Sequence, residues 1–257
     1  MMNVPISISL IVPAYNEAAF LPALLDSVEI ARKEYQLGAA AVEVIVADNA
    51  SSDETAAIAH ARGCRVVSVE RPSIAAARNG GAKVASGVIL AFVDADSRIH
   101  PQTFNAIEDM MRTQVVVGAT GVTLSRMSLP LSFMMALATP LAYIAGMDTG
   151  VVFCRRQDWQ EVGGYDENRL VAEDVKFLLD LKRLGRARGQ RFGRTSNART
   201  VTSTRKFDRH GDVRFMIKLL AMPLLAVISR ASAKRWIIRH WYEERGPRRN
   251  KGAAPDP

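Results

Sequence analysis

The stretch VILAFVDADS, residues 88–97, joins a run of six apolar residues to two carboxylates. Residues 88–93 have the length and the β-branched content of a buried strand. Asp94 and Asp96 follow directly, and carboxylates crowded at a strand end repel one another unless a cation or hydrogen-bond donors lie among them. The stretch therefore predicts a buried strand that delivers two acidic side chains to a ligand site.

The first hundred residues repeat this pattern of short apolar runs. Further strands are predicted at 7–12, 42–47 and 65–69, with helical patterns between the strands at 17–34, 53–62 and 74–86. Strands that alternate with helices indicate an α/β fold with a mainly parallel sheet flanked by helices. Ser51 and Glu54 have the spacing of a capping box, which predicts that the second helix opens at Asp53.

The second half continues the alternation less regularly. The expected elements are a helix at 101–112, strands at 115–120 and 150–156, a short helix at 157–162, a turn at 163–167, a helix at 173–184 and edge strands within 186–206. We expect one domain over residues 1–206. Its two halves would cover about 1–100 and about 101–206.

The charge is distributed unevenly along the 257 residues, although the net charge is only +8. Residues 183–257 carry 19 Lys and Arg against 5 Asp and Glu, which indicates an anionic partner. Residues 207–245 are expected to form a basic amphipathic helical extension, followed by a flexible tail at 246–257. Its interfacial aromatics suit the surface of an anionic membrane, while packing against protein is the alternative. Nucleic acid is not favoured, because no nucleic-acid motif accompanies the charge.

Residues 127–147 form an uncharged stretch of 21 residues, long enough to span a bilayer. Pro130, Pro140 and many small residues favour instead a helix that lies in an interface or packs on protein. Cys64 and Cys154 are too few for a disulfide framework. We therefore predict a cytoplasmic protein, peripheral on the inner face of the cell membrane.

Polar side chains follow three of the predicted strands. They are Tyr15, Asn16 and Glu17 after the first strand, Asp48 and Asn49 after the second, and Asp94 and Asp96 after the fourth. The carboxyl ends of parallel strands share one edge of the sheet, where ligands collect. The D-x-D spacing and its oxygen ligands favour Mg²⁺ or Mn²⁺, with phosphate oxygens completing the coordination. A solvated turn capped by Asp94 is the alternative.

Nucleotide recognition fits the same edge. Asp48 is placed to accept from an N–H group of a pyrimidine base, and Tyr15 or Glu17 to bound the base and ribose. Neither a Walker loop nor a Gly-x-Gly-x-x-Gly motif is present, which counts against a dinucleotide cofactor.

Five segments together resemble family 2 glycosyltransferases, which have the GT-A fold. They are IVPAYNEA, VIVADNASSDET, SIAAARNGGA, FVDADS and GGYDENRLVAEDVKF, in the family's order over residues 7–185. The resemblance implies a metal-dependent hexosyltransferase that moves a sugar from a UDP- or GDP-linked donor to an acceptor hydroxyl, with inversion. A lipid-linked or membrane-proximal glycan is the expected acceptor. The nucleotide half of the domain would be about 1–100 and the acceptor half about 101–206.

The resemblance also implies roles for individual residues. The expected nucleotide-sugar contacts are Pro13, Tyr15, Glu17, Asp48, Arg78, Asp94, Ala95, Asp96 and Arg205, with Asp94 and Asp96 holding the metal. Asp174 would be the general base. Glu173, Asp148 and Thr149 are expected near the sugar or the acceptor. A mere turn is the alternative for Asp148 and Thr149, and an exposed basic edge strand is the alternative for Arg205. For Asp174 the alternative is a capping role at a helix start.

Two other functions remain open at this stage. A sugar-nucleotide nucleotidyltransferase would share the sheet, the metal and the nucleotide, but the Gly-rich N-terminal loop of such enzymes is missing. A non-catalytic membrane-associated scaffold would retain only the fold, and intact Asp94, Asp96 and Asp174 argue against it.

Overall fold

The computed structural model describes residues 5–129, 131–132, 136, 150–169, 172–195, 197–205 and 211. The strands of the central sheet are β1 (Ile8–Ala14), β2 (Val42–Asp48), β3 (Arg65–Ser68), β4 (Ile89–Phe92), β6 (Val115–Ala119), β8 (Val152–Arg155) and β9 (Arg191–Arg194). The helices are α1 (Leu21–Lys33), α2 (Thr55–Ala61), α3 (Ile74–Val84), α4 (Thr103–Met111), α6 (Arg156–Glu161) and α7 (Glu173–Ala187). A short 3-10 helix, η1 (Ala39–Ala41), precedes β2.

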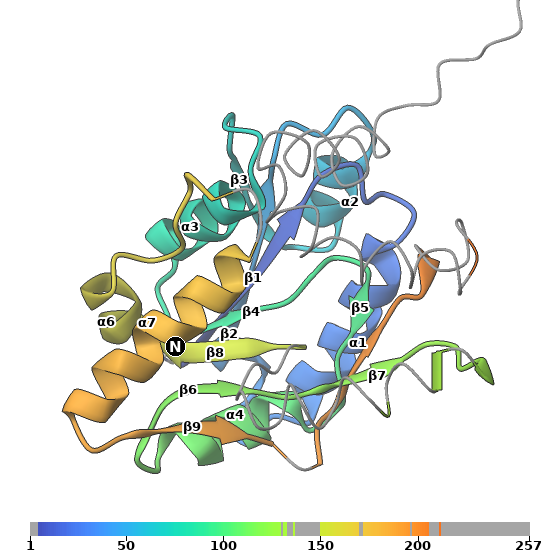
Figure 1. Cartoon of the computed structure of the whole chain (residues 1–257). Coiled ribbons are helices and arrows are strands. Elements are labelled where there is room, and N and C mark those ends of the chain that lie inside the picture. The colour runs from blue at the N-terminus through green and yellow to red at the C-terminus, as the bar shows by residue number, and fades with distance from the viewer. Residues whose placement is uncertain are drawn as a thin grey trace, which may run out of the picture.

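The central sheet is mainly parallel, as predicted (Figure 1). Its seven strands run in the order β3-β2-β1-β4-β8-β6-β9, and only β8 is antiparallel to its neighbours. Because β1 pairs with β2 on one side and β4 on the other, the carboxyl ends of these three strands meet. The predicted α/β fold class is confirmed.

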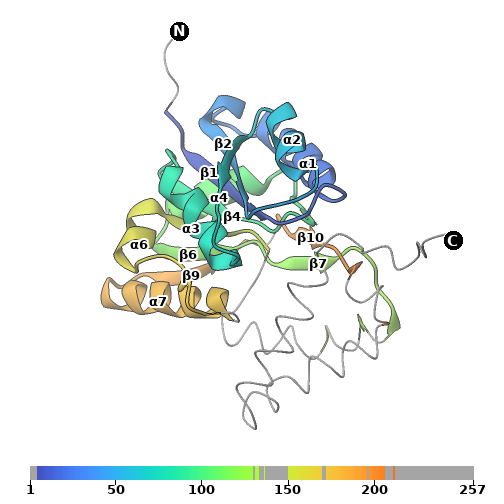
Figure 2. The same ribbon diagram turned by 90° about the horizontal axis from the view of Figure 1, so that it is seen from above.

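Helices cover both faces of the sheet in three layers (Figure 2). One apolar cluster joins β1 side chains such as Leu10 to α1 and α4, through Leu24 and Phe104. The other joins Ile11 to α3 and α7, through Ala75 and Phe177. The alternation of Leu10 and Ile11 follows from the two-residue period of a strand. Each fully buried aliphatic side chain contributes about 1.5–3 kcal/mol to this packing.

Helix α3 packs very closely on the sheet. A Cβ placed on Gly81 would lie 2.5 Å from Ile11 Cγ2 and 3.6 Å from the Ala47 Cβ. The small residues of α3 therefore let its backbone approach β1 and β2, and this brings Arg78 and Asn79 next to the strand ends.

A second sheet of very short strands lies beside the first. Its order is β5 (Ser97–Arg98), β10 (Thr200–Thr202) and β7 (Val122–Leu124). Strand β10 is antiparallel to β5 and parallel to β7. An edge strand was expected within 186–206, and both β9 and β10 lie there. This small sheet ties a late segment of the chain to the residues that follow Asp96.

Two predicted helix starts are wrong. Helix α1 begins at Leu21 rather than at 17, because a turn precedes it and Pro22 enters its first turn. Helix α2 begins at Thr55 and has no capping box. The Ser51 hydroxyl instead accepts a hydrogen bond from the Asn16 N–H at 3.0 Å. The side chain expected to cap a helix thus joins two loops.

Among the residues that the structure describes, no helix is both long and apolar enough to cross a membrane. Most of the apolar stretch 127–147 and, apart from Gly211, the extension 207–245 and the tail 246–257 lie outside the described residues. The proposed domain limits therefore stay predictions.

Candidate active site

A small cavity opens at the carboxyl ends of β1 and β2. It has a volume of about 210 Å³ and is lined by Pro13, Ala14, Tyr15, Asn49, Ala50, Pro72, Ile74 and Ala77. The Asn49 amide donates to the carbonyl oxygens of Val69 and Arg71, at 2.8 and 2.6 Å, and so fixes the loop between β3 and α3. Pro13 and Tyr15, both predicted site residues, border this cavity.

Asp48 ends β2 opposite Ala14 and is only 9% exposed. Its Oδ1 atom is buried and has no hydrogen-bond partner among the residues that the structure describes. A buried acceptor left without a donor costs about 1–3 kcal/mol, so a ligand N–H would be stabilised there. The geometry fits the predicted role of Asp48 as a base contact.

The loop after β1 is fixed by hydrogen bonds with the segment that follows β2. The Glu17 N–H donates to Thr55 Oγ1 at 2.8 Å, and the Ala18 N–H donates to Asp53 Oδ2 at 3.1 Å. Asn16 adopts a left-handed backbone, with φ of 52°, and its Oδ1 accepts from the Ser52 N–H. These contacts turn the chain so that the Glu17 side chain is buried, with 4% exposure.

Burial alone would raise the pKa of Asp53. The hydrogen bonds that Asp53 accepts from Thr55 and from the Ala18 N–H outweigh this, and the pKa lies below its usual range. Asp53 therefore holds the loop after β1 as an anion at neutral pH.

The three residues of the D-x-D segment have different surroundings. The Asp94 side chain is 52% exposed, whereas the Asp96 side chain is 14% exposed. Ala95 between them is buried in the apolar cluster with α1 and α4. The two carboxylates thus leave the core while the Ala95 methyl enters it, which leaves Ala95 only its backbone for ligand contacts.

Arg78 connects the D-x-D segment to the start of α7. Its Nη2 lies 3.1 Å from Asp94 Oδ1, and its Nη1 lies 3.3 Å from Glu173 Oε1. The guanidinium also lies over the Tyr165 ring, 5.1 Å from the ring centroid. Burial lowers the pKa of Arg78, but Asp94, Tyr165 and Glu173 outweigh it and raise the pKa, so the side chain stays charged.

Asn79, next to Arg78, clamps the turn that carries Tyr165. Its amide donates to the Tyr165 carbonyl at 2.8 Å and to Glu167 Oε1 at 2.9 Å, and its Oδ1 accepts from the Tyr165 N–H at 2.9 Å. Gly164 has φ of 71°, and a Cβ there would lie 2.7 Å from Asn79 Oδ1. The turn therefore requires glycine at 164 and a small polar partner at 79.

Arg205 reaches the same region from the segment after β10. Its Nη1 and Nη2 each lie 2.7 Å from a different oxygen of Glu17, and its Nε lies 3.0 Å from Asp96 Oδ2. The guanidinium carbon lies 4.6 Å from the centroid of the Phe20 ring. Glu17, predicted as a nucleotide contact, therefore faces Arg205.

Glu173 and Asp174 open α7 and have different exposures. Glu173 is buried; burial raises its pKa while Arg78 opposes the rise. Asp174 is half-buried, and its Oδ1 accepts from the Val175 N–H at 2.8 Å. Ala172, just before them, has a left-handed backbone with φ of 55°, which sets the direction in which the helix starts.

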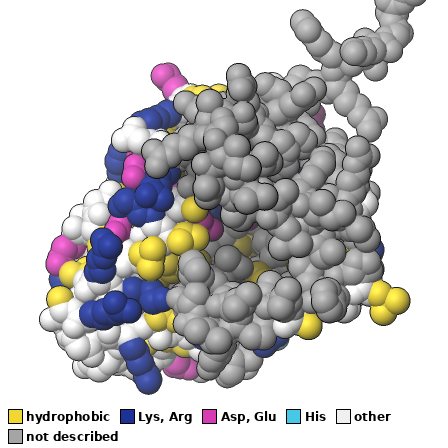
Figure 3. All heavy atoms as spheres, in the orientation of Figure 1, with side chains coloured by type: hydrophobic (Ala, Val, Ile, Leu, Met, Phe, Trp, Pro, Cys, Tyr) yellow, Lys and Arg dark blue, Asp and Glu magenta, His cyan; other side chains and the backbone are white. Residues whose placement is uncertain are grey.

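Charge separates along α7. Its first turn carries the acidic pair, whereas Lys and Arg side chains gather over the rest of the helix on the face shown in Figure 3. Acidic groups at the N-terminus of a helix are stabilised by its dipole. The charge of Asp174 is also close enough to Arg78 to help raise the pKa of that side chain.

The donor set fits a hard divalent cation held only in part by protein. Carboxylates of Asp94 and Asp96 are suitable ligands for Mg²⁺ or Mn²⁺, and Mg²⁺ often takes one or two carboxylates with phosphate oxygens. Among the described residues no group of three or more His, Cys, Asp or Glu could hold a metal ion. The remaining ligands would come from a bound diphosphate.

The structure brings six of the thirteen predicted site residues into two chains of contacts. Asp94, Arg78 and Glu173 form one chain of contacts, and Glu17, Arg205 and Asp96 form another. Asp148 and Thr149 lie outside the described residues. Sequence reasoning missed Phe20, Asn79 and Tyr165 as contributors. Asn79 and Tyr165 stood within the quoted segments SIAAARNGGA and GGYDENRLVAEDVKF, but no sequence signal pointed to Phe20.

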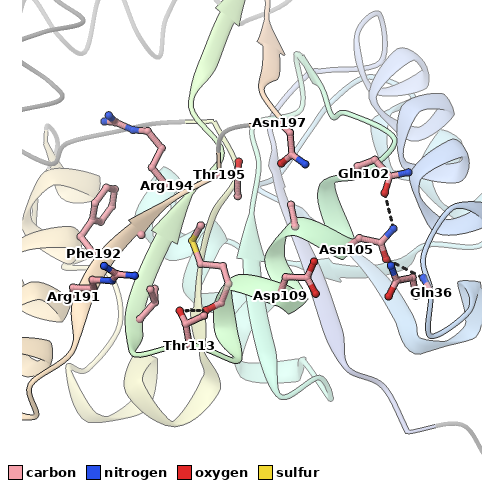
Figure 4. Close-up of a pocket in the computed structure, with 14 residues that line it drawn as sticks. Gln36, Gln102, Asn105, Asp109, Thr113, Arg191, Phe192, Arg194, Thr195 and Asn197 are labelled. Carbon is pink, nitrogen blue, oxygen red and sulfur yellow. Dashed lines mark hydrogen bonds between the residues drawn. The ribbon is translucent and has the colours of Figure 1, made fainter.

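A larger cavity lies elsewhere, between α4 and β9 (Figure 4). It has a volume of about 750 Å³, and its labelled lining residues include Gln102, Asp109, Arg191 and Asn197. None of the predicted site residues is among the described residues that line it. Size alone therefore does not locate the candidate site.

Sequence comparison identifies a family for part of the chain. Residues 9–130 match the sequence model of glycosyl transferase family 2, which confirms the resemblance noted above. An uncharacterized glycosyltransferase of Mycobacterium bovis is 32% identical over 90 residues, which cover 35% of this chain and 37% of the relative. The match thus spans little more than a third of that relative's length.

Structural comparison agrees on the fold. A mannosyltransferase of Pyrobaculum calidifontis, in complex with GDP-Man and Mn²⁺, aligns with a TM-score of 0.61 and 20% identity, over 92% of this chain and 74% of its own. Glucosyl-3-phosphoglycerate synthase of Mycobacterium tuberculosis, in complex with Mn²⁺, UDP and its product, aligns with a TM-score of 0.58 and 21% identity, over 86% and 79%. At these identities the likeness establishes the GT-A fold alone.

Proposed function

We propose that the chain, whose residues 9–130 match glycosyl transferase family 2, moves a sugar from a nucleotide diphospho-sugar to an acceptor hydroxyl with inversion. One observation carries the proposal furthest. Arg78 contacts both Asp94, on the proposed donor side, and Glu173, beside the proposed base. A single buried guanidinium thus links the groups that would hold the leaving diphosphate to those that would activate the acceptor.

The nucleotide would occupy the strand-end cavity. Pro13 and Tyr15 line that cavity, and the unpaired Asp48 oxygen supplies an acceptor for a base N–H. Similar structures contain UDP or GDP-Man, which supports a UDP- or GDP-linked donor here. The described residues favour neither base over the other.

The diphosphate would lie against Asp94 and Asp96 through a divalent cation. When bound, that cation would offset the negative charge that develops on the leaving group. Mn²⁺ in similar structures supports this assignment, with Mg²⁺ as the chemical equivalent. Arg78 and Arg205 add two positive charges to the same region.

Asp174 is the better candidate for the general base. Glu173 is buried and contacts Arg78, whereas Asp174 is half-buried at the open end of α7. An inverting transfer needs one carboxylate to take the proton of the attacking hydroxyl, on the side opposite the leaving group. Asp174 would take that proton and Glu173 would keep Arg78 in place.

The acceptor would be a lipid-linked or membrane-proximal glycan. This part of the proposal follows from the charge of residues 183–257, with 19 basic against 5 acidic side chains. A basic extension over 207–245 would contact an anionic membrane surface, and the enzyme would act there on the cytoplasmic side.

The test is a screen of UDP- and GDP-sugars for release of the nucleoside diphosphate, with Mn²⁺ or Mg²⁺ present. The wild type should release UDP or GDP from one donor. Asp96→Ala should weaken metal-dependent nucleotide binding, whereas Asp174→Asn should keep that binding and lose transfer.

Asp109→Asn is the matched control, because Asp109 lines the separate cavity, and it should behave as the wild type. Release of pyrophosphate would indicate a nucleotidyltransferase. No nucleotide binding at all would indicate a scaffold. Retained transfer in Asp174→Asn would remove Asp174 as the base.

A further inference from the structure

Arg205 uses its whole guanidinium group at the strand-end site. Both terminal nitrogens lie 2.7 Å from the Glu17 oxygens, and Nε lies 3.0 Å from Asp96 Oδ2. The guanidinium carbon of Arg205 lies 4.6 Å from the centroid of the Phe20 ring. A bidentate contact of this kind is both strong and directional. Arg205 therefore supplies a cation at a carboxylate that the proposed metal also needs.

The surroundings make this cation electrostatically necessary. The Glu17 side chain is 4% exposed and the Asp96 side chain is 14% exposed. Carboxylates withdrawn from water are costly unless a positive charge lies beside them. Burial lowers the pKa of Arg205, but the hydrogen bonds with Glu17 and the charge of Asp96 raise it, so the guanidinium stays protonated.

The backbone just before Arg205 is held in place by two contacts. Thr202 in β10 pairs with Ser97, which follows Asp96 directly in the chain. The next residues stay attached, since the Thr204 N–H donates to Ser125 Oγ at 3.2 Å. Because the backbone before Arg205 is held at Thr202 and at Thr204, release of the guanidinium requires only movement of the Arg205 side chain.

We propose that Arg205 is an internal counter-cation that occupies Asp96 until the nucleotide diphosphate arrives. This inference rests on the proposed function. A divalent ion that approaches alone must displace a guanidinium and meets its positive charge. When a diphosphate binds, its oxygens give the guanidinium a new anionic partner, and Asp96 becomes available to the metal ion.

Two consequences follow from this exchange. Binding of the metal ion and binding of the nucleotide must strengthen one another, because each removes an obstacle to the other. Phe20 lies against the guanidinium and should position Arg205 for its exchange between Asp96 and the diphosphate. Among the described contacts, Phe20 touches neither Glu17 nor Asp96.

The test measures Mn²⁺ affinity by electron paramagnetic resonance, with and without saturating UDP or GDP. It compares the full-length wild type with Arg205→Gln, Phe20→Leu and the control Arg199→Gln. Arg199 is exposed in the same segment and makes none of these contacts. Far-UV circular dichroism and melting temperature confirm that each variant is folded.

The wild type should bind Mn²⁺ weakly alone and about tenfold more tightly with nucleotide, within the usual range of coupling. Arg205→Gln should bind Mn²⁺ alone about tenfold more tightly than the wild type, so that the nucleotide adds little. Phe20→Leu should change in the same direction by a smaller factor, although it keeps the charge. Arg199→Gln should match the wild type.

Unchanged or weaker Mn²⁺ binding in both Arg205→Gln and Phe20→Leu would overturn the proposal. If Arg205→Gln does not fold, the Phe20→Leu result decides alone. A wild type that binds no nucleotide with Mn²⁺ present would instead refute the proposed function, so the two failures are distinguishable.

Discussion

Asn79→Ala removes the clamp between α3 and the turn before α7. The wild-type side chain makes three hydrogen bonds, two to the backbone of Tyr165 and one to Glu167. Tyr165 is only 3% exposed, so its N–H and carbonyl would stay buried without partners. Each such unpaired group costs about 1–3 kcal/mol, and the two together predict a loss of about 2–6 kcal/mol in the free energy of unfolding.

Urea unfolding of the full-length protein, followed by the fluorescence of its three Trp residues, measures this loss. The same change should lower the melting temperature by roughly 4–24 °C, at about 2–4 °C per kcal/mol for a chain of this size. Asn197→Ala is the matched control, because Asn197 is exposed, and it should stay within about 0.5 kcal/mol of the wild type.

Asn79→Asp refines the prediction. It keeps an acceptor for the Tyr165 N–H but loses both donated hydrogen bonds, and it places a carboxylate against Glu167, whose oxygen lies 2.9 Å from the native amide. It should be less stable than the wild type at neutral pH and recover in part as the pH falls. An Asn79→Ala variant as stable as Asn197→Ala would refute the reasoning.

Three further predictions concern other parts of the molecule. Burial raises the pKa of Tyr35 from 10.0 to about 12, so the wild type should lose stability as the pH rises from 10 to 12. Tyr35→Phe should lack this part of the alkaline slope in unfolding titrations, by at most about 2–3 kcal/mol. Gly81→Ala should destabilise the protein by about 1–3 kcal/mol, because the Ile11 contact outweighs the gain in helix propensity; a higher melting temperature would contradict this. Cys64 and Cys154 are free and buried, so a thiol reagent should label neither rapidly until the protein is unfolded.

The central sheet was predictable because its strands are long enough to show a pattern. β1 and β2 each have seven residues, and helical stretches separate them. The strands of the small sheet have only two or three residues and show no readable alternation. The antiparallel direction of β8 was equally hidden, since strand direction depends on long-range packing.

Helix starts were predicted less well than helices. Ser51 has the residue type and spacing of a helix cap, but its hydroxyl accepts from the Asn16 N–H, 35 residues earlier in the chain. A local rule cannot exclude a partner that the fold brings in from another loop. The early start predicted for α1 failed for a similar reason, because the turn after β1 is fixed by Asp53 and Thr55.

The candidate site was predictable as a set of residues but not as a set of contacts. The D-x-D spacing and the strand ends indicated Asp94, Asp96 and Asp48. The contact between Glu17 and Arg205 joins residues 188 positions apart, and the hydrophobic periodicity of a sequence does not indicate contacts at such a separation. The clamp from Asn79 to Tyr165 spans 86 positions and was hidden for the same reason.

The left-handed backbone of Ala172 has a consequence for how this chain tolerates change. A residue with a Cβ atom adopts a φ of 55° only at some conformational cost, and this cost is larger for a β-branched residue. Substitutions at position 172 should therefore differ in their effect. Glycine would remove the conformational cost, whereas valine or isoleucine would rotate the start of α7 and turn Glu173 and Asp174 away together. A library randomised at 172 and selected for activity should return glycine, alanine and asparagine. The rejected variants should still fold but should have a misoriented acidic pair.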